Sequence, residues 1–240
     1  MKLEDVLDDL AGRFLMHLPA CEEKNAERFL FQVEEAHWFY EDYYRRKYNF
    51  PYLNLKEFFI LLMGHSQYLK TPGELEDEFK KFLKYKKAVP VFGALIFNGP
   101  MTKILMVRGF GPRKTFTFPR GKICKSENEI DCAIREVYEE VGFDISDKII
   151  RGLSLNMHTK LRDSKLFVIL NVPESTKFVT QTRNEIKEIK WINLSLIESS
   201  NAETLTYIKS YIKEIKNVVK MIEQTRIKLD RKKIRKAFGL

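Results

Sequence analysis

The segment at residues 121–143, GKICKSENEIDCAIREVYEEVGF, constrains the fold more than any other part of this sequence. On a helix at roughly 100° per residue, four apolar side chains share one narrow sector while three carboxylates lie on the opposite side. The apolar residues are Ile130, Ile134, Val137 and Val141, and the carboxylates are Glu136, Glu139 and Glu140. The pattern predicts a helix with one face in a core and an acidic face opposite to it.

The acidic face has two interpretations. Most glutamate-rich helix faces are simply solvated. However, like charges three and four residues apart are mildly destabilising, and Arg135 is the basic residue nearest to these carboxylates. A divalent cation would remove the repulsion, because hard cations such as Mg²⁺ take oxygen ligands and keep waters and substrate phosphates in their other positions.

The residues around this helix predict how it begins and ends. Gly121 follows a strand-like run at residues 116–119 and offers flexible backbone that a ligand can approach closely. Ser126 is in position to cap the start of the helix, and Gly142 to end it. The segment is therefore expected to consist of a loop, a helix and a carboxylate face.

The same segment fills every specified position of the Nudix box, G-x5-E-x7-R-E-U-x-E-E-x-G-U, where U is bulky and apolar. The matching residues are Gly121, Glu127, Arg135, Glu136, Val137, Glu139, Glu140, Gly142 and Phe143. The chain thus resembles the Nudix hydrolases. That resemblance implies hydrolysis of a nucleoside diphosphate linked to another moiety, with Mg²⁺ or Mn²⁺ on Glu136, Glu139 and Glu140. It also implies a structural role, holding the loop and helix in place, for Gly121, Glu127, Arg135 and Gly142.

Length and composition leave room for one large or two smaller domains, since 240 residues with 44% hydrophobic content can fill cores. Cys21, Cys124 and Cys132 show no C-x-x-C spacing and cannot all pair, which favours a reducing compartment. No apolar run reaches the roughly 18 residues of a membrane span, and the acidic, amphipathic N-terminus is unlike a signal peptide. We therefore expect a soluble intracellular protein with no membrane partner.

Hydrophobic periodicity divides the chain into two parts. Residues 1–83 carry apolar residues at helical spacing, with turn signals at Pro19 and at residues 49–51, and predict an all-helical domain. The short basic run at residues 84–90 is a candidate hinge. Residues 91–240 form the second domain, with strand patterns at 91–97, 103–110, 165–172 and 188–193 around the box helix. The predicted fold class is α+β, with a helical domain followed by an α/β/α sandwich on a mixed sheet.

The C-terminal region carries most of the positive charge, with a net +8 in residues 207–240 out of +9 for the chain. From Asn201 onward the sequence predicts one long helix, apolar at Ile208, Ile212, Ile215, Val219 and Ile222. Lysines recur along one face of it, at Lys209, Lys213, Lys216 and Lys220. A solvated amphipathic helix would explain the stripe. So would a groove for single-stranded RNA, because phosphate neutralisation supplies most sequence-independent affinity. The run RKKIRK at residues 231–236 would extend that path or belong to a flexible end.

Trp38 and Asp42 lie one helical turn apart, so they share a face. A single Trp in a helix is most often part of a core. The alternative is that Trp38 stacks on a cationic purine while Asp42 accepts hydrogen bonds from its Watson–Crick edge. Methylated guanine is positively charged, so an aromatic face and a carboxylate would select it over unmodified guanine.

A second resemblance covers essentially the whole chain. It rests on AHWFYED at 36–42, VPVFGALIFN at 89–98, FPRGK at 118–122 and RNEIKEIKWI at 183–192. These segments resemble the catalytic subunit of the eukaryotic mRNA decapping enzyme. The resemblance implies hydrolysis of the 5′ cap of mRNA, with release of 7-methyl-GDP and RNA bearing a 5′-monophosphate. It assigns cap recognition to Trp38 and Asp42, and RNA binding to the region at about 202–240.

Further roles follow from the same resemblance. Glu185, just before a strand in a mobile loop, is implied to be the general base, although by itself it is an ordinary loop glutamate. Metals on the box glutamates would clamp the triphosphate, with Glu140 essential for turnover and Lys122 and Arg120 neutralising phosphate charge. A hydroxide formed with the help of Glu185 would attack phosphorus in line. An aromatic of the second domain would cover the other face of the cap base, and the candidates are Tyr207 and Tyr211.

The resemblance also implies partners and a place in the cell. A small activating decapping subunit is expected on the helical domain, with further decapping activators beyond it, in the cytoplasm and in mRNA-decay granules. Two other functions stay open. One is a Nudix hydrolase of free dinucleoside polyphosphates or nucleotide derivatives, for which the helical domain and basic tail would be unnecessary. The other is a non-catalytic RNA-binding scaffold, which would have no reason to keep four carboxylates at Glu136, Glu139, Glu140 and Glu185.

Overall fold

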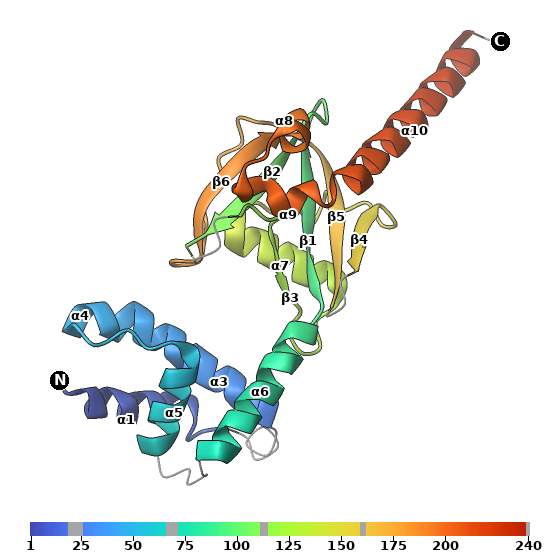
Figure 1. Cartoon of the computed structure of the whole chain (residues 1–240). Helices are drawn as coiled ribbons and strands as arrows, with labels where there is room; N and C mark the ends of the chain where they lie inside the picture. Colours follow the sequence, from blue (N-terminus) through green and yellow to red (C-terminus); the bar gives the residue numbers. More distant parts are fainter. Residues whose placement is uncertain (19–25, 66–71, 111–114, 159–161, 239–240) are drawn as a thin grey trace. The chain divides into compact units, whose positions relative to one another are not determined.

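The computed structural model describes residues 1–18, 26–65, 72–110, 115–158 and 162–238, with side chains described outside 26–28, 72–73 and 226–238. The chain divides into two compact units, Met1–Ala88 and Val89–Leu240 (Figure 1). Each unit encloses a hydrophobic core of its own. Each is therefore described by itself.

Among its described residues, the first unit contains only helices, as its periodicity predicts. They are α1 (Leu3–Phe14), α3 (Ala26–Phe39), the π-helix η1 (Tyr40–Arg45), α4 (Arg46–Tyr48), α5 (Leu55–His65) and α6 (Pro72–Ala88). Their apolar faces meet in a core that includes Leu10, Val33, Phe58, Leu62 and Phe82.

The predicted turn at residues 49–51 is confirmed. Asn49 ends α4 with a left-handed φ of 53°, and Phe50 donates its N–H to the carbonyl of Arg45 at 2.9 Å. The hydroxyl of the buried Tyr40 donates to the carbonyl of Pro51 at 2.7 Å, which ties η1 to the turn. The other predicted turn, at Pro19, lies outside the described residues.

The end of the first unit differs from the predicted boundary. Helix α6 continues through Ala88, so residues 84–88 of the candidate hinge are helical and belong to the first unit. Lys86, in the last turn of α6, forms an ion pair with the buried Glu34 of α3, which holds this turn against the first core. Val89 and Pro90 are left between α6 and the first strand of the second unit. That they act as a hinge stays a prediction.

The second unit is built on a mixed sheet. Its strands are β1 (Val91–Asn98), β2 (Lys103–Gly109), β3 (Arg120–Lys122), β4 (Ser154–His158), β5 (Asp163–Val172) and β6 (Ile186–Asn193). The order is β4-β5-β1-β2-β6, with β3 also paired to β1. Strands β1 and β5 are parallel, and the other pairs are antiparallel. All four predicted strands are present, while β3 and β4 were not predicted.

Helices cover both faces of this sheet. Side chains alternate along a strand, so Ala94 and Ile96 of β1 pack in the cluster under α7 (Glu129–Val141). Leu95 and Phe97 pack in the opposite cluster, with α8 (Leu194–Ser199), α9 (Thr206–Lys209) and α10 (Ile212–Phe238). Every residue of β1 is buried, as expected for a strand covered on both faces. The second unit is therefore an α/β/α sandwich (Figure 1), and the predicted fold class is confirmed.

The prediction of one continuous helix from Asn201 onward is wrong. A 3-10 turn η2 (Glu203–Leu205), α9 and α10 follow one another, with a break at Ser210 and Tyr211. The Ser210 hydroxyl donates to the carbonyl of Tyr207 at 2.7 Å, and the Tyr211 N–H bonds to the carbonyl of Ile208 at 2.9 Å. A serine that bonds to nearby backbone competes with the regular helical pattern, which explains the break. Within the described residues, no helix is both long and apolar enough to cross a membrane.

Candidate active site

Helix α7 is the element on which the candidate site is built. Asn128 caps its N-terminus, since the side-chain oxygen accepts from the N–H groups of Ile130 and Asp131 at 3.0 Å each. The prediction of Ser126 as the cap is therefore wrong: Ser126 adopts φ 64° in the preceding turn. The predicted end at Gly142 is confirmed, with φ 66° and an N–H bond to the carbonyl of Tyr138 at 2.8 Å.

Arg135 and Glu127 brace the loop before α7 against the helix. Arg135 Nε lies 2.8 Å from Glu127 Oε1, and Nη2 lies 2.9 Å from Oε2, a bidentate arrangement. Arg135 also donates to the carbonyl of Lys122 at 3.1 Å, and Cys124 N–H donates to Glu127 at 2.9 Å. The Arg135 guanidinium lowers the pKa of the Glu127 carboxyl to about 2. This geometry is what the Nudix resemblance implies for these two residues.

Glu140 is buried, although the amphipathic pattern placed it on an exposed acidic face. Its Oε2 accepts a hydrogen bond from the backbone N–H of Arg120 in β3 at 2.9 Å. Burial raises the pKa of this carboxyl well above its ordinary value, and the nearby charges of Glu185 and Glu136 raise it further. The acidic face of α7 is thus partly enclosed by the protein.

Glu136 lies directly against Gly121. A Cβ atom at position 121 would stand 1.8 Å from Glu136 Oε2, so only glycine leaves room for this carboxylate. The prediction that Gly121 follows a strand is wrong. Gly121 lies inside β3, opposite Phe92 of β1. Burial raises the pKa of Glu136, with further increases from Glu139 and Glu185, against the opposing effect of Arg135.

The carboxylates are not gathered into a ready coordination sphere. Within the described residues, no group of three or more His, Cys, Asp or Glu side chains is arranged to hold a metal ion. Glu136 accepts from Arg135 Nη1 at 2.7 Å, and the more exposed Glu139 lies 3.4 Å from the same nitrogen. The donor chemistry nevertheless fits a hard divalent cation, because the groups are carboxylates and burial and mutual repulsion disfavour the charged form of Glu136 and Glu140.

Glu185 immediately precedes β6 and is exposed. Its backbone carbonyl accepts from the N–H of Phe110 at 3.3 Å. Its charge contributes to the raised pKa values of both Glu136 and Glu140, so the structure brings it into electrostatic range of the α7 carboxylates. The base candidate and two of the metal-ligand candidates therefore lie in one region of the second unit.

Two basic residues of β3 border this region. Lys122 is half-buried and pairs with Val91 of β1. The guanidinium of Arg120 lies 5.1 Å from the ring centroid of Tyr207, which also contacts Tyr211 edge-on at 5.4 Å. Sequence reasoning missed the bond from the Arg120 backbone to Glu140, because a backbone donor carries no residue signature. Burial raises the pKa of Tyr207, while Arg120 lowers it.

In the first unit, Trp38 is exposed to 58%, so the interpretation of Trp38 as a core residue is wrong. Trp38 is the penultimate residue of α3. The last residue, Phe39, stacks its ring on that of Tyr43, with 4.4 Å between the ring centroids. Asp42 is half-buried in η1, so the helix changes from α to π between the two residues. The exposed indole of Trp38 is accessible to a ligand. Cap recognition by this pair stays a prediction.

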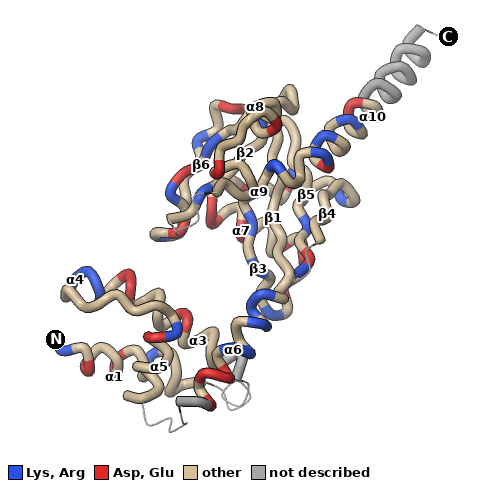
Figure 2. Tube along the Cα trace, in the orientation of Figure 1, with Lys and Arg blue, Asp and Glu red and all other residues tan. Residues whose placement is uncertain are grey.

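The prediction that the four lysines of the tail form one stripe on one helix is wrong. Lys209 belongs to α9 and donates to the carbonyl of Ser200 at 2.9 Å. Lys213, Lys216 and Lys220 are exposed on α10. Basic positions recur along the described part of this helix (Figure 2). Lys216 pairs with Glu198 of α8 at 2.6 Å. The break at Ser210 separates the first lysine from the others.

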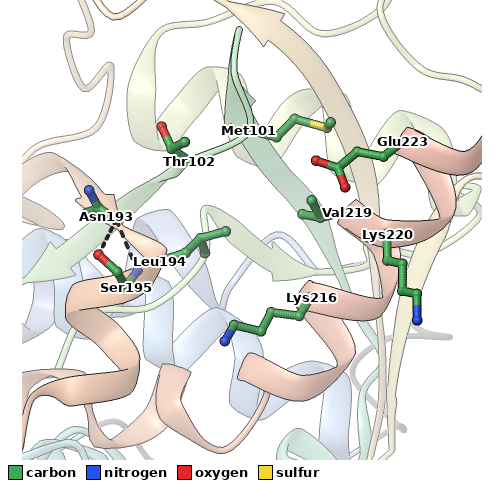
Figure 3. A pocket seen from close by; sticks show the side chains of 9 residues that line it. All are labelled: Met101, Thr102, Asn193, Leu194, Ser195, Lys216, Val219, Lys220 and Glu223. Carbon is green, nitrogen blue, oxygen red and sulfur yellow. Dashed lines mark hydrogen bonds between the residues drawn. The ribbon is translucent and has the colours of Figure 1, made fainter. Parts of the chain in front are cut away.

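An open pocket lies beside α10 (Figure 3), and its lining includes none of the α7 carboxylates. It runs between α10, the turn that follows β1, and the junction of β6 with α8. Its lining residues are Met101, Thr102, Asn193, Leu194, Ser195, Lys216, Val219, Lys220 and Glu223. Two of the predicted RNA-binding lysines therefore border it, while the side chains at residues 231–236 lie outside the described set.

The two units match two family descriptions. Residues 5–85 match the Dcp2, box A domain, and residues 87–211 match the NUDIX domain. The fold and the carboxylate helix are thus those of a Nudix domain. The chain belongs to the NUDIX-domain family, with a Dcp2 box A domain preceding the hydrolase fold.

Curated relatives match across both units. One is the mRNA decapping complex subunit 2 of Schizosaccharomyces pombe, 41% identical over 191 residues, covering 79% of this chain and 26% of that protein. Another is the m7GpppN-mRNA hydrolase of Saccharomyces cerevisiae, 38% identical over 200 residues, covering 82% and 20%. A third is the mRNA-decapping enzyme subunit 2 of Arabidopsis thaliana, 37% identical over 214 residues, covering 88% and 57%. The chain thus spans about a quarter or less of the two yeast proteins and over half of the plant protein.

Proposed function

We propose that this chain hydrolyses the 5′ 7-methylguanosine cap of mRNA, releasing 7-methyl-GDP and RNA with a 5′-monophosphate, which commits the transcript to 5′-to-3′ decay. The observation that carries the proposal is the joining of a Dcp2 box A domain to a Nudix domain in one chain, with decapping relatives that match across both. A hydrolase of free nucleotides would need the second unit alone.

The chemistry is proposed from the residues around α7. Mg²⁺ or Mn²⁺, held by Glu136, Glu139 and Glu140, would supply Lewis-acid polarisation of the phosphates. Glu185 takes a proton from water, and the hydroxide oxygen attacks phosphorus in line. The bridging P–O bond then breaks, and the RNA departs with its 5′-monophosphate. Lys122 and Arg120 offset the charge of the triphosphate. In this scheme the base and the metal-binding carboxylates act at the same phosphorus. The effect of the Glu185 charge on the pKa values of Glu136 and Glu140 supports their closeness.

Substrate recognition is proposed to use both units. Trp38, with its exposed indole, stacks on the methylated base, and Asp42 accepts hydrogen bonds from its edge. Lys213 and Lys220, exposed on α10, contact RNA phosphates, with Lys209 and Lys216 as weaker candidates because both already have protein partners.

Partners and cellular location follow from the same proposal. The first unit binds a small activating subunit, further decapping activators join the assembly, and the protein acts in the cytoplasm and in mRNA-decay granules. The names of the relatives, which describe a complex subunit and a decapping enzyme subunit, support assembly with partners. The cellular location stays a prediction.

The test is hydrolysis of RNA with a radiolabelled cap, in Mg²⁺, in Mn²⁺ and with chelator, with products separated by thin-layer chromatography. We expect metal-dependent release of 7-methyl-GDP. Glu140→Gln keeps an acceptor for the Arg120 N–H and should fold normally while losing turnover. Glu129→Gln, on the exposed first turn of the same helix, is the matched control and should retain activity. Cleavage of free dinucleoside polyphosphates with capped RNA left intact would contradict the proposed substrate, and activity in Glu140→Gln would contradict the proposed site.

A further inference from the structure

The connection between β5 and β6 is fastened to the C-terminal end of α7. We call residues 178–182 of this connection the strap. Val179 donates its N–H to the carbonyl of Val141 at 3.0 Å, and Gln181 donates its N–H to the carbonyl of Glu139 at 2.8 Å. Thr180 adds a side-chain contact, with Oγ1 3.3 Å from the same Glu139 carbonyl. The strap therefore binds the helix turn that carries Glu139 and Glu140.

These bonds supply hydrogen-bond donors to the C-terminal end of α7. The last carbonyls of an α-helix have no partner within the helix, and Gly142 returns its N–H to Tyr138 alone. The strap supplies donors to the carbonyls of Glu139 and Val141. The close approach also requires glycine at position 142, because a Cβ there would stand 2.3 Å from the carbonyl oxygen of Val179. Gly142 thus both ends α7 and admits the strap.

Both ends of the strap region are anchored in the second unit. At its start, the ring of Phe178 packs edge-on between Phe143, at 5.7 Å, and Trp191 of β6, at 6.0 Å. Beyond it, the carbonyl of Glu185 accepts from Phe110 N–H at 3.3 Å. Two residues separate the strap from Glu185. The position of Glu185 relative to the α7 carboxylates is therefore set over a short length of chain.

The side chain of Thr180 contacts both the end of α7 and the following residues of the strap. Its hydroxyl lies 3.2 Å from the Thr182 hydroxyl and 3.3 Å from the Thr182 carbonyl, and it accepts the Thr182 N–H at 3.3 Å. One hydroxyl oxygen thus links the turn leading to Glu185 with the end of α7.

We propose that Thr180 is a positioning residue for Glu185, holding the loop that carries the base against the turn of α7 that carries Glu139 and Glu140. The inference deepens the proposed function and rests on it, because Glu185 has to be near the reacting water. The alternative is that the strap merely caps α7 and contributes to stability alone. In that case the loss of its hydroxyl would lower the unfolding temperature without a selective loss of the chemical step.

The experiment compares Thr180→Val, which keeps the shape and loses the hydroxyl, with Thr180→Ser, which keeps the hydroxyl. Single-turnover decapping of capped RNA gives the maximal rate and the apparent KM. We expect Thr180→Val to lower the maximal rate about tenfold or more with KM nearly unchanged, since small displacements of catalytic groups cost about 10²-fold. Thr180→Ser should restore the rate, and Thr176→Val, in the same connection, serves as the matched control.

Hydrogen–deuterium exchange on the free proteins supplies a readout independent of activity. In Thr180→Val the amides of residues 179–185 should exchange faster, while those at the centre of α7 should not change. A wild-type rate in Thr180→Val, an equal loss in Thr180→Ser, or unchanged exchange of the strap would overturn the inference. If the wild-type protein releases no 7-methyl-GDP, the proposed function fails, and the exchange comparison still decides whether Thr180 fixes the loop.

Discussion

Gly121→Ala is the substitution for which the structure makes the sharpest prediction. The new Cβ would stand 1.8 Å from Glu136 Oε2 and 2.0 Å from its carboxyl carbon, whereas real Cβ contacts essentially never fall below 3.0 Å. The carboxylate oxygen therefore has to move by at least the difference, 1.2 Å. A displacement of about 1 Å in a catalytic group costs about 10²-fold in rate, which is about 2.7 kcal/mol of transition-state stabilisation.

The same substitution should leave folding nearly unchanged. Gly121 lies in a strand without a positive φ, and alanine in a strand is favoured over glycine by about 0.5 to 1 kcal/mol. The clash is with the end of a flexible side chain, Glu136, that can rotate away from Arg135. We therefore expect the free energy of unfolding to change by less than about 1 kcal/mol.

The assay pairs single-turnover decapping with urea denaturation of the same preparations. Gly99→Ala is the control, because a Cβ at Gly99 meets nothing within 4 Å. It should match the wild-type protein in both measurements. The reasoning would be refuted if Gly121→Ala kept a rate within about threefold of wild type, or if it lost more than about 3 kcal/mol of stability.

Three further predictions follow from the site. The Glu127 carboxyl has a pKa of about 2 in the folded protein against 4.5 ordinarily, so its stabilisation is present above about pH 4.5 and is lost as the pH falls toward 2; Glu127→Gln should flatten this part of the stability profile measured by urea titration. Mg²⁺ at about 100 times its Kd should raise the melting temperature by about 5 °C, measured by calorimetry, and Glu136→Gln combined with Glu140→Gln should abolish that rise. Trp38→Ala should change stability by less than about 0.5 kcal/mol, because the side chain is exposed, while reducing the preference for methylated over unmethylated caps in competition assays.

The box helix was predictable because its signals agree with one another. Its hydrophobic period, its terminal Gly142 and its fixed spacing of charged residues all describe the same segment, and local agreement of this kind marks an element that folds as its sequence indicates. The four long strands were predictable for the same reason, since each carries a continuous or alternating apolar run. Three residues of β3 are too few to show a period, so its position came from pairing with β1 alone.

What sequence reasoning missed depends on contacts between distant segments. Ser126 and Asn128 are both good capping residues, and only the backbone of the folded loop decides between them. The burial of Glu140 follows from its bond to the backbone of Arg120, twenty residues earlier. Two of the bonds that hold the strap come from the backbone N–H groups of Val179 and Gln181, and such donors carry no residue signature in the sequence. These misses cluster around the candidate site, where local rules are expected to give way to function.

The charge balance of the site argues that its form serves a ligand rather than stability. Five carboxylates lie in or beside α7, those of Glu127, Glu136, Glu139, Glu140 and Glu185. Arg135 pairs with the first three, and the charge of Arg120 opposes the raised pKa of Glu140 without cancelling it. The Arg135 guanidinium makes its bidentate pair of hydrogen bonds with Glu127. The half-buried Glu136 and the buried Glu140 are left with raised pKa values, which cost stability wherever the groups are ionised. A divalent cation bound there, as proposed above, would offset that cost, because it favours the ionised form of the carboxylates.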